Sequence, residues 1–287
     1  MNIFFKGLAA SLIIAGSAIN SFAQDTNSLL WKISGNDLEK PSYLFGTIHL
    51  LPADKYFFSG KMQEALNASE VLALEVDMDI PFADQMKMAM EMIMPDGKTW
   101  EDYMTAEEFI SLKSAFIDSL GIKEKKVAQY SKIRPIYVSG LILTELLGKV
   151  KMYEKELTSM AKKGKKIIIG LETIQEQMKI VGDISLEDQI EDMKSSTASS
   201  LRDYNEMLDA YTTQNLAELE RVSTDHESFE TIETKLLTER NARWIISMKD
   251  LLAKNSTFFA VGALHLVGDD GLINQLKTAG YTVEAVN

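Results

Sequence analysis

Residues 43–50 read YLFGTIHL and residues 258–266 read FFAVGALHL. In both stretches an apolar run with aromatic residues, typical of a buried strand, leads to a glycine, two further residues, a histidine and a leucine. Glycine permits a sharp turn or a close approach of the backbone at the end of a strand. Two of the three histidines, His49 and His265, are therefore predicted to lie at the carboxyl edge of a sheet, where open α/β folds bind their ligands.

Two other stretches that are typical of buried strands end in the dipeptide Leu-Glu. They read VLALE, which ends at Glu75, and IIIGLE, which ends at Glu172. A carboxylate at the end of a buried strand is costly unless it is paired or binds a cation. Taken singly, such a residue is more often a helix cap or an ion-pair partner, and a lone histidine is more often a core residue. One polar site would satisfy both glutamates and both motif histidines, so we predict a shared site.

The remaining pattern predicts an α/β fold with a central mixed or mostly parallel sheet and a large helical insertion or cap. Strands are expected at residues 29–34, 42–45, 70–76, 167–171, 257–261 and 281–286. Helices are expected over residues 82–159 and 185–254, and the strongly apolar stretch 137–147 is expected to be central to the core. The alternating methionines at residues 86–94 are interpreted as flexible core and lid packing.

Composition narrows the classes of partner and compartment. The chain has no cysteine and a formal net charge of −12, which argues against thiolate metal sites, nucleic acid and an anionic membrane. Residues 1–23 have the pattern of a signal peptide: one lysine, an apolar stretch and a small-x-small site before Gln24. We therefore predict an exported protein, periplasmic or secreted, without a stable membrane anchor. Residues 24–287 are expected to form a single α/β domain; the oligomeric state is not predicted.

These motifs resemble those of the TraB/GumN family, which is related to the TIKI metalloproteases. The resemblance covers essentially the whole mature chain in order, and its motifs are YLFGTIH at 43–49, LE at 74–75, GLET at 170–173, ERN at 239–241 with Trp244, and GALHLVG at 262–268. It implies an α/β fold with a divalent metal, and proteolysis in the TIKI branch. It marks as site residues His49, His265, Glu75 and Glu172, with Arg240 and Asn241 as polar support. The family motif is commonly Gly-Ala-Gly-His, and in this chain Leu264 occupies the position of the second glycine. The difference implies a changed pocket shape.

Residues and resemblance together predict a metal-dependent, peptidase-like hydrolase that acts on a peptide or small-molecule substrate. A divalent ion such as Mn, Co or Zn would lower the pKa of a bound water, and a carboxylate would act as general base. Arg240 would stabilise oxyanion charge or orient a carboxylate. The predicted metal ligands are His49, His265 and Glu172. The predicted catalytic residues are Glu75, Arg240 and Asn241, and the roles of the two glutamates are open to exchange.

Two other function classes remain open at this point. Two histidines and one carboxylate are also the ligand set of non-haem iron enzymes. A non-enzymatic protein that binds metal, haem or a peptide would use the same residues without turnover. The third histidine, His226, lies in a polar stretch and is read as a surface residue.

Overall fold

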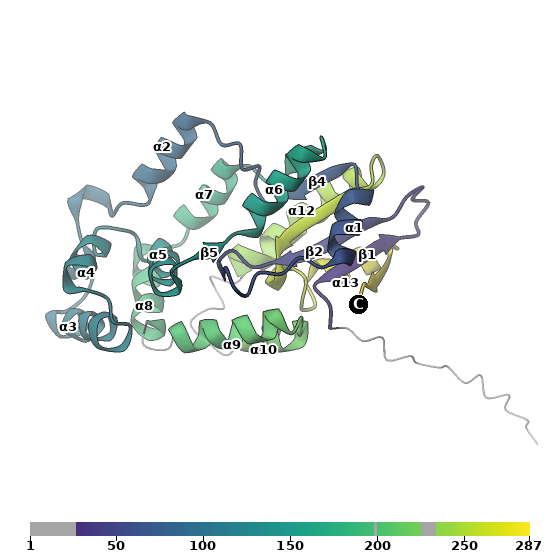
Figure 1. Cartoon of the computed structure of the whole chain (residues 1–287). Coiled ribbons are helices and arrows are strands. Elements are labelled where there is room, and N and C mark those ends of the chain that lie inside the picture. The colour runs from purple at the N-terminus through teal and green to yellow at the C-terminus, as the bar shows by residue number, and fades with distance from the viewer. Residues whose placement is uncertain (1–26, 198–199, 225–233) are drawn as a thin grey trace, which may run out of the picture.

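The computed structural model describes residues 27–197, 200–224 and 234–287. The predicted signal peptide and His226 lie outside the described residues. The signal peptide and the surface position of His226 therefore stay predictions. Within the described part, the α/β class with a mixed, mostly parallel sheet is confirmed: a six-stranded sheet has the order β6-β4-β7-β2-β1-β8 (Figure 1). The strands are β1 (Leu30–Ser34), β2 (Ser42–Thr47), β4 (Val71–Leu74), β6 (Ile167–Gly170), β7 (Thr257–Gly262) and β8 (Thr282–Ala285), and a separate short pair joins β3 (Leu51–Pro52) to β5 (Val150–Lys151).

Four neighbouring strands of the sheet, β6, β4, β7 and β2, run parallel to one another. In the register of the sheet, Thr47 is opposite Gly262, and Leu74 is opposite both Ala260 and Gly170. The carboxyl ends of these strands therefore meet at one edge, as the two Gly-x-x-His motifs predict. β1 is antiparallel to both β2 and β8, which makes the sheet mixed.

The burial of the strands follows their place in the sheet. Every residue of β4 is buried, and so is every residue of β7 before Gly262. β6 is different: it forms the edge of the sheet, and Ile167 is 59% exposed. The prediction of a fully buried strand before Glu172 is therefore wrong, because an edge strand has a neighbour on one side only.

The helices form two groups in Figure 1. One group lies beside the sheet, and the other forms a helical part beyond it, which confirms the predicted insertion or cap. The helices are α1 (Gly60–Ala68), α2 (Phe82–Glu91), α3 (Ala106–Ser114), α4 (Glu124–Tyr130), α5 (Pro135–Leu147), α6 (Tyr153–Lys163), α7 (Ile174–Gly182), α8 (Leu186–Ser196), α9 (Ser200–Thr212), α10 (Leu216–Thr224), α12 (Glu239–Leu252) and α13 (Leu272–Thr278). The helical part contains α2, α3, α4, α5 and α8.

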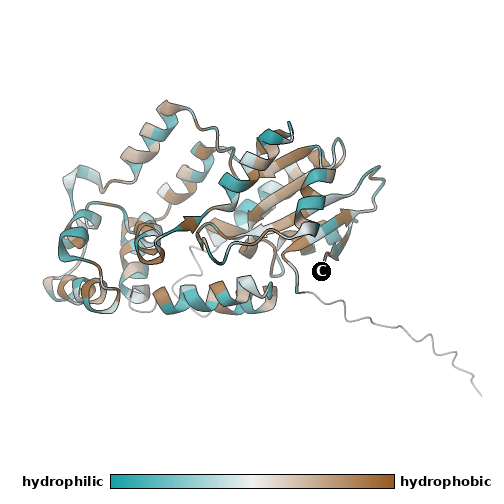
Figure 2. Cartoon of the chain, in the orientation of Figure 1, coloured by the Kyte–Doolittle hydropathy of each residue, from teal (hydrophilic) through white to brown (hydrophobic). Residues whose placement is uncertain are grey.

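Buried apolar side chains form two clusters. The larger cluster contains the sheet and the helices that pack on it, and the smaller one lies in the helical part around the stacked rings of Trp100 and Phe116. In Figure 2 the central strands are brown over most of their length, whereas helices such as α9 alternate between brown and teal. This difference is expected because a central parallel strand is covered on both faces, whereas a surface helix buries one stripe.

The apolar helix α5 departs from expectation. Only Pro135, Val138 and Ile142 are buried in it, so the prediction that it is central to the core is wrong. Other residues of α5, among them Ile136 and Tyr137, line a cavity. The helix is apolar on both sides because one side packs in the helical part and another faces that cavity.

No helix within the described ranges combines the length and the apolar character that crossing a bilayer requires.

Candidate active site

The predicted site residues follow the carboxyl ends of the four parallel strands. His49 follows β2, Glu75 follows β4, Glu172 follows β6 and His265 follows β7. A fifth element, α12, adds Arg240, Asn241 and Trp244, which share a buried face with Met248 and Leu252 at the helical spacing of three to four residues. Parallel pairing thus brings together side chains that are up to 216 positions apart in the sequence.

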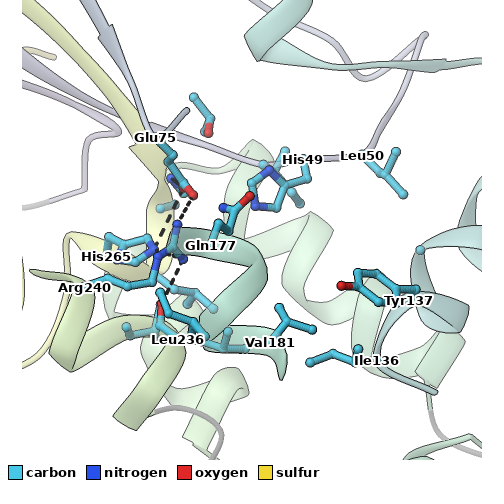
Figure 3. Close-up of a pocket in the computed structure, with 18 of the residues that line it drawn as sticks. His49, Leu50, Glu75, Ile136, Tyr137, Gln177, Val181, Leu236, Arg240 and His265 are labelled. Carbon is cyan, nitrogen blue, oxygen red and sulfur yellow. Dashed lines mark hydrogen bonds and ion pairs between the residues drawn. The ribbon is translucent and has the colours of Figure 1, made fainter. Parts of the chain in front are cut away.

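Arg240 is the centre of this group (Figure 3). Its Nη2 donates to Glu75 Oε2 at 2.5 Å and to Glu172 Oε1 at 2.7 Å, and its Nε donates to the same Glu172 oxygen at 3.0 Å. Nη1 donates to the carbonyl of Leu236 at 2.9 Å. The guanidinium lies 4.5 Å from the ring centre of Trp244, and only 6% of Arg240 is exposed. Arg240 thus contacts both predicted site carboxylates, and its catalytic role stays a prediction.

Asn241 holds His265 in one tautomer. The Asn241 amide nitrogen donates to the carbonyls of His265 at 3.1 Å and Asp270 at 3.0 Å, so its oxygen faces His265 Nδ1 at 2.7 Å. Nδ1 must therefore carry the proton, and Nε2 is left as an acceptor, 3.1 Å from Arg240 Nη1. Burial lowers the pKa of His265 to about 3, which agrees with a neutral ring.

The pKa values of the two carboxyl groups are shifted in opposite directions. Burial opposes ionisation of Glu75, but the interactions with His265 and Arg240 outweigh it and lower the pKa of Glu75 to about 2. Glu75 Oε1 also accepts the backbone N–H of Gly262 at 2.8 Å and lies 3.9 Å from His265 Nε2. For Glu172, burial is the largest influence and raises the pKa, although Arg240 and the Trp244 indole N–H contact the carboxylate. Glu75 is thus the more firmly ionised of the two.

His49 is paired with a residue that the sequence did not indicate. Its Nδ1 lies 2.9 Å from Oε1 of Glu154, the second residue of α6. This hydrogen bond is the main reason that the pKa of His49 is raised to about 9. The side chain of His49 is 66% exposed, and it lines the same cavity as Glu75 and His265. Because Nδ1 is engaged by Glu154, Nε2 is the ring nitrogen left for a ligand in that cavity.

The glycines of the two motifs serve close packing. Neither has a positive φ, so the predicted sharp turn is not their role. A Cβ on Gly46 would lie 3.0 Å from the Cβ of Ala263, and one on Gly262 would lie 3.3 Å from Glu75 Oε1. The first glycine therefore lets β2 pack against the second motif, and the second lets a carboxylate approach the backbone N–H.

Gly46→Ala is expected to destabilise the fold by about 1–3 kcal/mol, the usual cost of overpacking. The added methyl group would press on Ala263, which follows the adjacent strand. Urea denaturation measures the change in the free energy of unfolding. Gly60→Ala is the matched control, because no atom lies within 4 Å of the added Cβ at the first position of α1. Equal stability of the two variants would contradict this account of the motif.

The strand ends form the polar end of a cavity of about 640 Å³ between the sheet edge and the helical part. Its size is typical of a site for a small ligand. Polar groups gather at one end, and apolar side chains from α2, α5, α7 and α9 line the rest. Figure 3 shows Glu75, His265 and Arg240 on one side of the cavity, Ile136 and Tyr137 on the other, and Val181 between them. Such a cavity can orient a polar group over a charged floor while it holds an apolar part.

The predicted metal ligands His49, His265 and Glu172 do not surround a common point. Among the described residues, no three His, Cys, Asp or Glu side chains are grouped so that they could hold a metal ion. The guanidinium of Arg240 stands among both carboxylates and Nε2 of His265, and a positive group there repels a second cation. In this arrangement the residues do not fit a divalent ion, and the ligand set stays a prediction.

Comparison with known proteins identifies the family. A model of the TraB/PrgY/gumN family matches residues 29–285. The chain belongs to this family. The motifs that carried the resemblance lie within the matched range, so the family prediction is confirmed.

The relatives of this TraB/PrgY/gumN member include proteins named metalloproteases. The metalloprotease TIKI1 of Xenopus tropicalis is 24% identical, over 96% of this chain and 65% of the relative. TIKI1 of Homo sapiens is 23% identical, over 91% of this chain and 62% of the relative. The chain therefore spans somewhat less than two thirds of the length of these relatives. No solved structure gives a significant match.

Glu154, which contacts His49, was not predicted as a site residue of this family member. Glu154 lies in an amphipathic stretch and reads as an ordinary surface residue of a helix. Its place next to the buried Tyr153 is a weak signal, because the buried face of α6 begins there. Trp244, by contrast, stands four residues after Arg240, a spacing that places both side chains on one face of a helix, and the two are in contact.

Proposed function

We propose that the chain is a hydrolase that cleaves the bond between a carbonyl carbon and its nitrogen or oxygen in a ligand held in the cavity. The observation that carries the proposal is the convergence of Glu75, Arg240, His265 and His49 at one end of a cavity of ligand size. Buried charged groups that meet in a cleft are a common feature of catalytic sites. The similarity to metalloproteases supports cleavage of a peptide-like bond.

His49 is the residue to which we assign proton donation to the leaving group, because its raised pKa keeps the ring protonated at neutral pH. Both oxygens of Glu75 already accept hydrogen bonds, from Gly262 and Arg240, which leaves this carboxylate less free to act as the predicted base. His49 Nδ1 is fixed by Glu154, as an orienting carboxylate fixes a catalytic histidine, and Nε2 is open toward the cavity. In this proposal Glu75 and Glu172 position Arg240, whose charge stabilises negative charge that develops on the carbonyl oxygen.

A requirement for a divalent ion rests on the names of the relatives and not on the arrangement of these residues. Binding of an ion by His49, His265 and Glu172 would require Arg240 to leave the carboxylates that it contacts. The experiment must therefore measure turnover both in chelator and with added Mn, Co or Zn. Restoration by one ion alone would show that turnover depends on that ion, and loss of its binding in the His49→Ala and His265→Ala variants would place it at this site.

The test is cleavage of a quenched fluorescent library of peptides and acyl amides by the whole chain. His49→Ala is expected to lower turnover by about 10²–10⁴-fold, the usual contribution of a positioned acid or base. His226→Ala serves as the matched histidine control and should keep full turnover. Full turnover in the His49 variant would contradict the assigned role, and absence of cleavage with tight ligand binding would favour a binding protein.

The binding protein is the second candidate because most of the cavity wall is apolar and Arg240 is already engaged by two carboxylates. A cavity of this kind can retain a ligand without acting on it. The same experiment separates the two functions.

A further inference from the structure

The part of the cavity away from the polar end is lined almost wholly by apolar side chains. They come from four helices and the segments near them, and include Met88, Met92, Ile136, Leu143, Met178, Val181 and Met207. The titratable acids and bases of the lining, apart from tyrosines, are His49, Glu75, Arg240 and His265, and all belong to the polar end. The cavity therefore has two regions of different chemistry.

Two of the three tyrosines of the wall have hydroxyl groups that bind to the protein itself. The hydroxyl of Tyr211 donates to the carbonyl of Gly46 at 3.0 Å, and that of Tyr204 donates to the carbonyl of Leu50 at 2.9 Å. These two rings therefore contribute apolar surface, and the third tyrosine, Tyr137, adds one hydroxyl group on the side of the cavity away from the charged residues. The helices of the wall satisfy most of their backbone groups internally, so they offer a ligand few hydrogen-bond partners.

A peptide backbone is poorly suited to this region. Each residue of a bound peptide brings an N–H and a C=O, and burying them without partners costs free energy. A hydrocarbon chain brings no polar group, and it gains free energy with each methylene that leaves water. A cavity of about 640 Å³ is also far larger than one amino-acid side chain requires.

We propose that the substrate is an amphiphile with a long fatty-acyl chain, which lies in the apolar region while its amide or ester carbonyl lies at the polar end. This inference rests on the proposed function, because it names the substrate class of the same site. Hydrolysis would add water across the acyl bond: the hydroxyl joins the carbonyl carbon, the bond to the nitrogen or oxygen breaks, and the leaving group takes the proton. The products are a fatty acid and an amine or alcohol.

The methionines of the wall suit such a chain. Met88 and Met92 come from α2 and its end, Met178 from α7, and all three are flexible and can adapt to the path of an alkyl chain. α2 has no buried residue, and its Met86 and Met90 are 49% and 70% exposed. Apolar surface thus continues from the cavity wall to the outside of the same helix.

The test uses isothermal titration calorimetry of the whole chain with butanoate, octanoate, dodecanoate and hexadecanoate below their micelle concentrations. Affinity is expected to rise about fourfold for each added methylene until the cavity is filled. Ile136→Trp, which shortens the apolar region at the side away from the charged residues, should weaken hexadecanoate at least tenfold and leave octanoate nearly unchanged. Ile110→Trp is the matched control, because Ile110 is 64% exposed on α3 and does not line the cavity.

Affinity that does not depend on chain length would overturn the proposal, and so would equal losses in the two tryptophan variants. Tighter binding of a tetraleucine peptide than of every fatty acid would replace the acyl chain with an apolar peptide. Binding and turnover separate the two inferences. Length-dependent binding without cleavage of N-acyl amides contradicts only the hydrolase, whereas cleavage of short amides without length dependence contradicts only the acyl chain.

Discussion

Arg240→Ala is expected to destabilise the folded chain by about 3–5 kcal/mol, because removing one partner of a buried ion pair leaves uncompensated buried charge. Here the loss is shared by two carboxylates, Glu75 and Glu172, whose side chains are 8% and 3% exposed. Without the guanidinium they would also repel one another. Urea denaturation, with turnover measured below the transition, checks the prediction.

The neighbouring Arg243 provides the control. Its side chain is 44% exposed and lies 3.8 Å from Glu172, so Arg243→Ala should change stability by no more than about 1 kcal/mol. If both arginine variants unfold at the same urea concentration, Arg240 is not the centre of the site. Arg240→Lys should recover only part of the loss, since an ammonium group cannot make the two-point contact with Glu172.

Glu75→Gln is expected to lower both the stability of the fold and the turnover, although glutamate and glutamine side chains have nearly the same shape. One oxygen of Glu75 accepts from the N–H of Gly262 and the other from Arg240. A glutamine amide would turn its NH₂ group toward one of these donors in either orientation. We expect a loss of about 1–3 kcal/mol from the unsatisfied group, and a fall in turnover of about 10²-fold from the displacement of Arg240.

Glu70→Gln is the control for this substitution. Glu70 immediately precedes β4, and its side chain is 48% exposed and paired with Lys40 at the surface. Its amide variant should keep both stability and turnover. Normal stability and turnover in the Glu75 variant would mean that this carboxylate neither holds Arg240 nor takes part in the reaction.

Much of the fold could be read from local pattern. The six runs of apolar residues predicted as strands correspond to strands of the sheet, because alternation and apolar runs reflect burial directly. The edge position of β6 was not predictable, since its isoleucine run is as apolar as that of a central strand. Strand order depends on pairing between distant segments, which no local pattern encodes.

The sequence by itself determined which residues of the site stand at strand ends: His49 and His265 after glycine motifs, and Glu75 and Glu172 after apolar runs. Position at a strand end follows from local pattern, and parallel pairing then carries all four to one edge.

Only the tertiary structure decided how these residues pair. α12 inserts Arg240 between the two glutamates, and α6 brings Glu154 to His49 across 105 positions of sequence. Both contacts depend on the directions in which helices cross the sheet edge, which are set by packing over the whole core. For the same reason the sequence indicated a metal-binding cluster, whereas folding gives the carboxylates an arginine as their cation.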